Sequence, residues 1–194
     1  MIKGIIFDCF GVLVTSSYEP FKSEVLKNDT ELIEKFMDIE NRSSRGEISL
    51  EVAEKEFSEL SGLSFQETTD YLTNNPRNVI LLRYIAQELH GRYKLSMLSN
   101  VADDRVEELF EPNDIDLFDD MVLSFQVNLA KPDEKIYVLA AERLGLQPSE
   151  CVFIDDNQGY CSAAADVGMK TVLYSDFKNA KRTLEELLAT DSNE

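Results

Sequence analysis

The sequence predicts an α/β fold with a parallel sheet and an all-helical insertion after the first strand. Short apolar runs alternate with helix-period segments through the second half of the chain, which is the βαβ pattern. Between Val14 and about Arg77 the strand signal vanishes and acidic amphipathic segments replace it. A chain of 194 residues can bury one sizeable core and a small satellite, so a core with an insertion suits its length.

The strands are expected where short apolar runs occur. The first is residues 5–7, which run into Asp8 and a loop with Gly11. The others are expected at residues 93–98, 121–123, 151–154 and 171–173. Crossover helices are expected at residues 103–110, 134–144 and 178–188, where apolar residues recur at spacings of three and four. Gly145 is a plausible stop for the second of these helices, and residues 189–194 look like a frayed tail.

The insertion is expected to contain four amphipathic helices, at residues 20–27, 30–41, 49–61 and 64–74. Ser49 and Ser64 stand at plausible N-cap positions, and Glu67 completes a capping box with Ser64. We assign residues 15–77 to a helical cap and residues 1–14 and 78–194 to the core. Because the insertion follows the first strand directly, we expect it to lie over the strand ends as a lid.

The charge and composition exclude several classes of function. The formal net charge is −18, from 37 acidic and 19 basic residues, which argues against nucleic acid as a partner. An anionic substrate would need a cation, a lysine or helix N-termini to approach this surface. Apolar runs are strand-sized and no signal segment is recognised, so we expect a cytoplasmic protein with no membrane partner. Cys9, Cys151 and Cys161 fit reduced thiols.

Polar residues follow four of the expected strands or open the helices after them, where open α/β sheets bind ligands. They are Asp8, the pair Ser99-Asn100, Lys131 before Pro132, and the pair Asp155-Asp156. Each alone has an ordinary explanation as turn chemistry, a surface lysine or a helix cap. Adjacent carboxylates at a buried strand end repel each other, however, and a hard cation such as Mg²⁺ with oxygen ligands would relieve that.

Together the motifs resemble the haloacid dehalogenase superfamily of hydrolases. They read Phe-Asp-x-x-Gly-Val-Leu, Leu-Ser-Asn, Lys-Pro-Asp and Asp-Asp-Asn in chain order. The run from Arg45 to Ser49 resembles the middle of that superfamily's small helical cap. The resemblance extends from residue 4 to about residue 174. It implies a Rossmann-like, three-layer core with a parallel sheet and a cap inserted after the first strand.

The resemblance also implies roles for individual residues. Asp8 would be the nucleophile that forms an aspartyl phosphate, and Lys131 would assist it while holding the phosphoryl group. The implied phosphate- or substrate-binding residues are Ser99, Asn100, Lys131 and Arg45. The implied Mg²⁺ ligands are Asp8, the carbonyl of Phe10, Asp155 and Asp156. The implied partner is a small phosphorylated metabolite, bound by a monomer or homodimer.

Phe10 leaves the reaction open. Phosphatases of the superfamily have an Asp there as acid and base, and losing such help removes roughly 10²- to 10⁴-fold in rate. The charged residues near the cap's expected substrate-facing turn are Glu40, Arg42, Arg45 and Glu47. 2-Haloacid dehalogenases commonly have an aromatic residue at position 10 and use no metal, but the Asp155-Asp156 pair argues against that reading. We therefore expect a Mg²⁺-dependent phosphomonoester phosphatase, with a weakly active or non-catalytic phosphate-binding protein as the main alternative.

Overall fold

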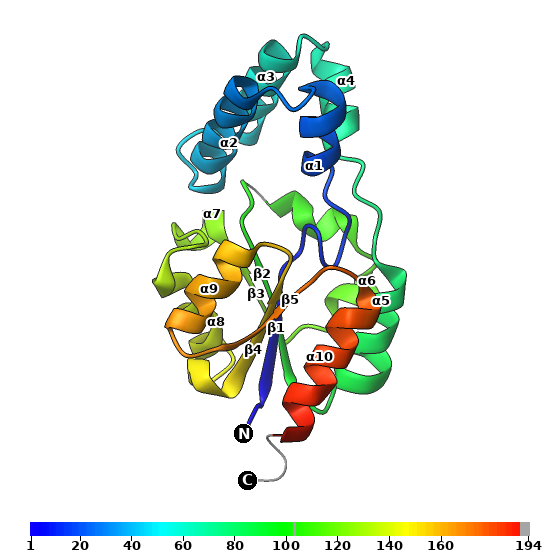
Figure 1. The fold of residues 1–194 in the computed structure, drawn as a ribbon, viewed down its shortest axis with the longest axis vertical. Coiled ribbons are helices and arrows are strands. Elements are labelled where there is room, and N and C mark those ends of the chain that lie inside the picture. Colours follow the sequence, from blue (N-terminus) through cyan, green and yellow to red (C-terminus); the bar gives the residue numbers. More distant parts are fainter. Residues whose placement is uncertain (103, 191–194) are drawn as a thin grey trace.

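A computed structural model of the chain describes residues 1–102 and 104–190. Its centre is a five-stranded, fully parallel sheet with the order β3-β2-β1-β4-β5. The strands are β1 (Gly4–Phe7), β2 (Lys94–Ser99), β3 (Asp120–Leu123), β4 (Cys151–Asp155) and β5 (Lys170–Leu173). Helices cover both faces of the sheet (Figure 1). The predicted Rossmann-like, three-layer α/β fold is confirmed.

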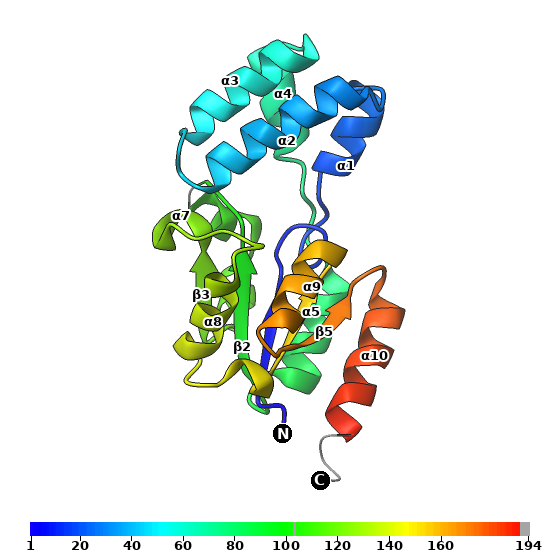
Figure 2. The ribbon, with the colours of Figure 1, turned by 60° about the vertical axis from the view of Figure 1, so that its left-hand side comes forward.

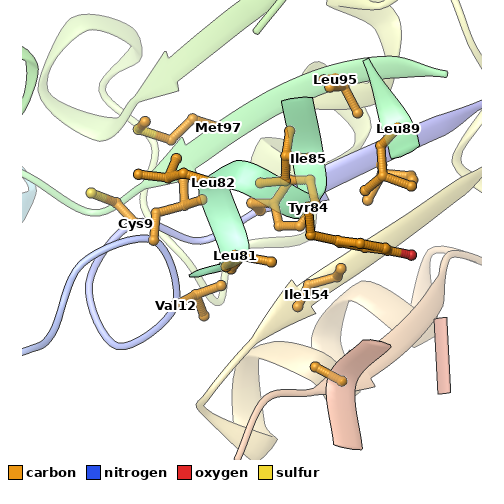
Figure 3. Packing of buried hydrophobic residues seen from close by; sticks show 14 of the residues in the cluster. Cys9, Val12, Leu81, Leu82, Tyr84, Ile85, Leu89, Leu95, Met97 and Ile154 are labelled. Carbon is orange, nitrogen blue, oxygen red and sulfur yellow. The ribbon is translucent and has the colours of Figure 1, made fainter. Parts of the chain in front are cut away.

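The side chains of β1 alternate between two apolar clusters, one on each face of the sheet. Ile5 and Phe7 belong to the cluster beneath α5 (Val79–Tyr84), the π-helical turn Ile85–Leu89 and α10 (Phe177–Thr190). Figure 3 shows residues of α5 and this turn packed against Leu95 and Met97 of β2. Successive side chains of a strand point to opposite faces of the sheet, and helices cover both faces, so every residue of β1 is buried.

The opposite face is covered by α8 (Glu134–Arg143) and α9 (Gln158–Asp166). Ile6 of β1 packs there with Leu98 and Phe153. The shorter elements of the core are the 3₁₀ helices Asp104–Leu109 and Pro148–Glu150 and the helices α6 (Pro112–Ile115) and α7 (Ser124–Val127). The helices α8 and α9 each begin after a loop at the carboxyl edge of the sheet. The loops that could bind a ligand therefore lie at one end of the core.

The insertion forms a separate group of helices beyond the carboxyl ends of the strands (Figures 1 and 2). It contains α1 (Tyr18–Pro20), which continues into a π-helical segment (Phe21–Val25), α2 (Thr30–Ser44), α3 (Leu50–Ser61) and α4 (Phe65–Leu72). Ser49 caps α3, and Ser64 and Glu67 form the expected capping box on α4. We call residues 15–77 the cap. Their own apolar cluster supports the predicted division of the chain, whose boundaries remain a prediction.

Two linkers join the cap to the core, and they lie side by side. Val14 and Arg77 form an antiparallel bridge. The amide of Thr15 donates to the carbonyl of Pro76 (2.9 Å), and the amide of Asn78 donates to the carbonyl of Leu13 (2.8 Å). The linkers therefore form a short two-stranded ribbon between cap and core.

Four elements differ from the sequence-based expectations. The expected helix at residues 103–110 is a 3₁₀ helix over Asp104–Leu109, and residue 103 lies outside the described residues. Its apolar residues Val106 and Leu109 are three apart, the repeat of a 3₁₀ turn. The helices α5 and α9 were not predicted. The expected frayed tail is helical as far as Thr190, and residues 191–194 lie outside the described part. In the described ranges, no helix is both long and apolar enough to cross a membrane.

The cap's aromatic cluster yields a test of its independence from the core. Phe36 is fully buried and stacks on Phe57 with ring centroids 4.5 Å apart. We expect Phe36→Ala to cost about 3–5 kcal/mol within the cap, through the cavity it leaves. Hydrogen exchange should show lost protection in α2 and α3 with β1 and β4 unchanged. Met37→Ala, at a neighbouring side chain that is 48% exposed, is the control. Equal loss of protection in β1 would contradict a separate cap.

Candidate active site

The carboxyl ends of β1 and β4 bring Asp8 and Asp155 together. These strands are neighbours, and the amide of Asp8 donates to the carbonyl of Ile154 (2.8 Å). The chain passes from β1 to β2 and β3 on one side and returns to β4 and β5 on the other. Asp8 and Asp155 therefore lie at the topological switch point of the sheet, where α/β folds open a crevice for ligands.

Lys131 joins these two carboxylates. Its ammonium nitrogen lies 2.7 Å from Asp8 Oδ1 and 2.7 Å from Asp155 Oδ2, and all three side chains are buried. The same nitrogen lies 4.9 Å from the centre of the Tyr160 ring and 5.5 Å from that of Phe153. Two ion pairs and two aromatic faces thus hold one charge at a fixed position.

Asn100 fixes the backbone of Lys131. Its side-chain nitrogen donates to the Lys131 carbonyl (3.0 Å), and its side-chain oxygen accepts from the Lys131 amide (2.8 Å). Both ends of this amide are therefore occupied, which makes Asn100 a positioning residue for the lysine. Its direct contact with substrate remains a prediction. The helix that follows, α8, begins at Glu134 as expected, with Asp133 as its N-cap.

Asp156 approaches the loop after β1. Gly11 has φ +90°, and a Cβ atom on it would lie 2.0 Å from Asp156 Oδ2. Glycine is thus required at position 11 both for the backbone conformation and for the space occupied by the carboxylate. Asp155 keeps its orientation because its Oδ1 accepts from the amide of Asn157 (2.8 Å), and Asn157 caps α9.

The three carboxylates perturb one another. Burial raises the pKa of Asp8 to about 8, Lys131 opposes this shift, and Asp155 adds to it. Burial and the charge of Asp155 also raise the pKa of Asp156. Burial alone lowers the pKa of Lys131, but its two carboxylate partners outweigh burial and raise that pKa above its ordinary value. The cluster therefore holds more negative charge than one ammonium balances.

The carboxylate cluster fits a hard divalent cation. Asp8, Asp155 and Asp156 each offer an oxygen, and these oxygens lie within 4.8 Å of one another. Carboxylate oxygens are the ligands that Mg²⁺ takes in proteins. The predicted fourth ligand, the carbonyl of Phe10, lies in the same loop as Asp8 and remains a prediction. The Phe10 side chain is half-buried and packs against the apolar cluster under α5.

Ser99 and Arg45 lie at different ends of the site. Ser99 ends β2 and is fully buried, and within the described ranges its hydroxyl has no oxygen or nitrogen partner, although the Cys9 thiol lies beside it. Arg45 is an exposed residue at the C-cap of α2. The substrate-binding roles of both remain predictions.

Cys9 packs in the apolar cluster (Figure 3), and burial together with the charge of Asp8 raises the pKa of its thiol. A thiol that stays protonated is a poor nucleophile.

Sequence reasoning missed the contact that seats the cap on the core. Ser124 Oγ, at the first residue of α7, lies 2.7 Å from the carbonyl oxygen of Ser44 in α2, and both residues are buried. Ser124 follows β3 directly, so its place at a strand end was a usable signal. The aromatic residues around Lys131 were also not predicted, because Phe153 reads as an ordinary strand residue.

The family follows from a match over most of the chain. The family model of haloacid dehalogenase-like hydrolases matches residues 2–168. The chain belongs to the haloacid dehalogenase-like hydrolase family. The predicted superfamily is thereby confirmed, and the chain is a hydrolase of this family.

Solved structures of the family share the fold across nearly the whole chain. A HAD-like family hydrolase from Porphyromonas gingivalis has 26% identity and a TM-score of 0.73, covering 97% of this chain and 98% of that one. A HAD family enzyme from Bacteroides thetaiotaomicron, solved in complex with magnesium and inorganic phosphate, has 23% identity and a TM-score of 0.67, covering 89% and 93%. The second likeness shows the fold alone.

Curated relatives match over shorter stretches. Bifunctional epoxide hydrolase 2 of Sus scrofa is 40% identical over 36% of this chain and 13% of its own length. The phosphorylated carbohydrates phosphatase of Thermotoga maritima is 29% identical over 54% of this chain and 47% of its own. (S)-2-haloacid dehalogenase 4A of Burkholderia cepacia is 32% identical over 41% and 35%. The chain thus spans less than half the length of each of these relatives.

Lys131 is the first residue we would change at this site. Lys131→Met removes the charge that pairs Asp8 and Asp155, and we expect a loss of about 3–5 kcal/mol in the free energy of unfolding. Adding Asp155→Asn to that variant should recover part of the loss, because one buried charge is then removed. Urea unfolding measures both effects, with Lys170→Met at an exposed position as the control. A double variant no more stable than Lys131→Met would argue against charge imbalance as the cause.

Gly11 gives a second test. Gly11→Ala places a methyl group where the Asp156 carboxylate lies, so we expect weaker Mg²⁺ binding in calorimetric titrations. Gly145→Ala is a matched control, because Gly145 also has positive φ (+73°) but has no atom within 4 Å of its would-be Cβ. Both variants should lose stability through backbone strain. Similar Mg²⁺ affinities in the two would show that Asp156 does not contribute to the metal site.

Proposed function

We propose that this hydrolase is a Mg²⁺-dependent phosphomonoesterase that forms an aspartyl phosphate on Asp8. The observation that carries the proposal is the charge of the cluster. Three carboxylates, Asp8, Asp155 and Asp156, surround one ammonium, so the fully ionised group has a charge of −3 + 1 = −2. One divalent cation balances that excess, and a cluster that only stabilised the fold would have no need of it.

A cation also answers the problem of substrate approach. The chain has a net charge of −18, which repels a phosphate dianion at long range. Lys131 is already paired with two carboxylates and cannot by itself offset that field. Mg²⁺ held by Asp8, Asp155 and Asp156, with the carbonyl of Phe10, would neutralise the charge on the transferring phosphoryl group.

The side chains of the core account for the covalent chemistry. An oxygen of Asp8 attacks phosphorus, the bond to the leaving oxygen breaks, and an acyl phosphate forms on Asp8. Water then attacks phosphorus, the acyl-phosphate bond breaks, and inorganic phosphate leaves with Asp8 restored. Lys131 holds Asp8 in line and offsets charge during both steps, and the buried hydroxyl of Ser99 can donate to a phosphoryl oxygen.

The relatives include both phosphatases and a dehalogenase, and the pair Asp155-Asp156 favours phosphate chemistry between them. The Bacteroides enzyme was solved with magnesium and inorganic phosphate, and the Thermotoga relative is a phosphatase of phosphorylated carbohydrates. A small phosphorylated metabolite is the substrate class that follows. The Burkholderia dehalogenase and the aromatic Phe10 favour dehalogenation, but a metal-free site for a 2-haloacid anion has no use for the adjacent Asp155 and Asp156.

A second candidate is a protein that binds a phosphorylated ligand without turning it over. Phe10 favours it, because an apolar side chain stands where an acid and base would act and packs into the core cluster. Hydrolysis and simple binding differ in one respect: only hydrolysis requires the Asp8 carboxylate as a nucleophile.

Phosphate release decides between these functions. We expect the wild type to hydrolyse p-nitrophenyl phosphate and small alkyl phosphates with Mg²⁺ and to stop with EDTA. Asp8→Asn should abolish release, whereas Asp166→Asn, at an exposed residue of α9, should leave it unchanged. If the wild type releases no more phosphate than Asp8→Asn, the chain is not a phosphatase. Chloride release from 2-chloropropionate in EDTA would then establish the dehalogenase.

A further inference from the structure

The core of the proposed phosphatase has no proton donor at position 10, because Phe10 cannot move a proton. The carboxylates of the described cluster, Asp8, Asp155 and Asp156, are assigned to nucleophilic attack and to the metal. An alkoxide is a poor leaving group, so an alkyl phosphate needs a proton on its leaving oxygen. An acid and base has to come from another part of the molecule, and the cap lies over the same strand ends (Figures 1 and 2).

We propose that Glu40 of the cap helix α2 is the acid and base catalyst of this hydrolase, replacing from the cap the group that position 10 lacks. The inference rests on the proposed function and adds to it the residue that moves the proton. It stands on the docking of α2 against the core and on the set of charges that the Glu40 side chain faces.

Two hydrogen bonds place Glu40 one helical turn before the point where α2 contacts the core. The carbonyl of Glu40 accepts from the hydroxyl of Ser44 (2.8 Å), one turn later in α2. The carbonyl of Ser44 in turn lies 2.7 Å from the hydroxyl of Ser124, which follows β3. Ser124 also accepts from the amide of Val101, in the loop after Ser99 (2.9 Å). The last turn of α2 is thereby anchored to the core loops that follow β2 and β3, the first of which begins after Ser99.

The Glu40 side chain faces charged groups of both the cap and the core. Those that act on it are Lys22 and Glu19 of the cap, which pair with each other, and Lys131 of the core. Tyr160, whose ring lies beside Lys131, is in turn influenced by Glu40. The charge of Lys131 thus acts both on Glu40 of the cap and on the nucleophile Asp8, whose Oδ1 is 2.7 Å from the Lys131 ammonium.

The environment of Glu40 suits proton transfer near neutral pH. The residue is half-buried, and desolvation raises the pKa of its carboxyl to about 7, against the opposing charges of Lys22 and Lys131. In the described part of the chain, the carboxyl makes no hydrogen bond or ion pair that would hold it in one state. An acid that must also act as a base works best with a pKa near the operating pH.

The other charged residues of the cap turn are less suitable. The Arg42 guanidinium pairs with Asp38 and Glu56 within the cap, and an arginine cannot release its proton. Arg45 and Glu47 have exposed side chains. Glu40 differs from them in position: it lies one helical turn before the buried Ser44, and therefore on the face of α2 that meets the core.

The proton balance closes over the two steps. As Asp8 attacks phosphorus and the bond to the leaving oxygen breaks, the proton of the Glu40 carboxyl passes to that oxygen and an alcohol leaves. Glu40 is then a carboxylate. It takes a proton from the water that attacks the aspartyl phosphate, so inorganic phosphate is released and both carboxyl groups return to their starting states.

Glu40→Gln tests the assignment with two substrates in Mg²⁺. For alkyl phosphates we expect turnover to fall by roughly 10²- to 10⁴-fold, since the leaving oxygen goes unprotonated. p-Nitrophenolate leaves without a proton, so the variant should release a rapid burst of about one p-nitrophenolate per site and then slow at the second step. Glu34→Gln is the control, at an exposed residue of the same helix, and should show neither effect.

The pH dependence provides a third readout. For wild type, kcat/KM on alkyl phosphates should decline above a pKa near 7, because the acid must be protonated; ionisation of the substrate affects wild type and variant alike. Glu40→Gln should lack this decline, and Glu40→Asp should retain it at a reduced rate.

Three outcomes would overturn the inference. Wild-type rates in Glu40→Gln would show that another group moves the proton. Equal loss on both substrates, with no burst, would show a role in positioning the cap. Absence of Mg²⁺-dependent, Asp8-dependent release from the wild type would overturn the proposed function and this inference together, whereas the first two outcomes leave the phosphatase standing.

Discussion

The contact on which the site depends is the pairing of the Lys131 ammonium with Asp8 and Asp155. A buried ammonium is stable only with close counter-charges, and the two carboxylates supply them from neighbouring strands. Several nearby features serve this contact: Asn100 holds the backbone of Lys131, and Asn157 holds the second oxygen of Asp155 through its amide. The carboxyl edge of the sheet is thereby rigid where chemistry requires a fixed nucleophile.

The negative charge of this edge accounts for the different roles proposed for the core and the cap. The carboxylates of the core suit cation binding and attack on phosphorus, and none of them is assigned to protonating the leaving group. The cap brings a side chain whose surroundings keep it partly protonated near neutral pH. Substrate choice and proton transfer would then come from the same helical element, so a change in the cap alters both.

Much of the fold and of the core site could be predicted from the sequence. Parallel strands end at one edge, so acids and a lysine placed after three different strands had to meet there, and Asp8, Lys131, Asp155 and Asp156 do. The short apolar runs predicted the bounds of all five strands to within one residue. The orientation of the cap could not be predicted, since which face of α2 meets the core depends on Ser44 and Ser124, 80 positions apart. The same holds for α9, whose small residues give little periodic signal.

The ribbon between cap and core has a mechanical consequence. Two chain segments bridged through Val14 and Arg77 connect the cap to the core at one place. Movement of the cap is therefore expected to be centred on this ribbon, which would serve as the hinge. Opening of the cap at this hinge would separate the buried Ser44 carbonyl from the Ser124 hydroxyl. One hydroxyl–carbonyl contact would then oppose each opening, and its strength would bear on how fast product can leave.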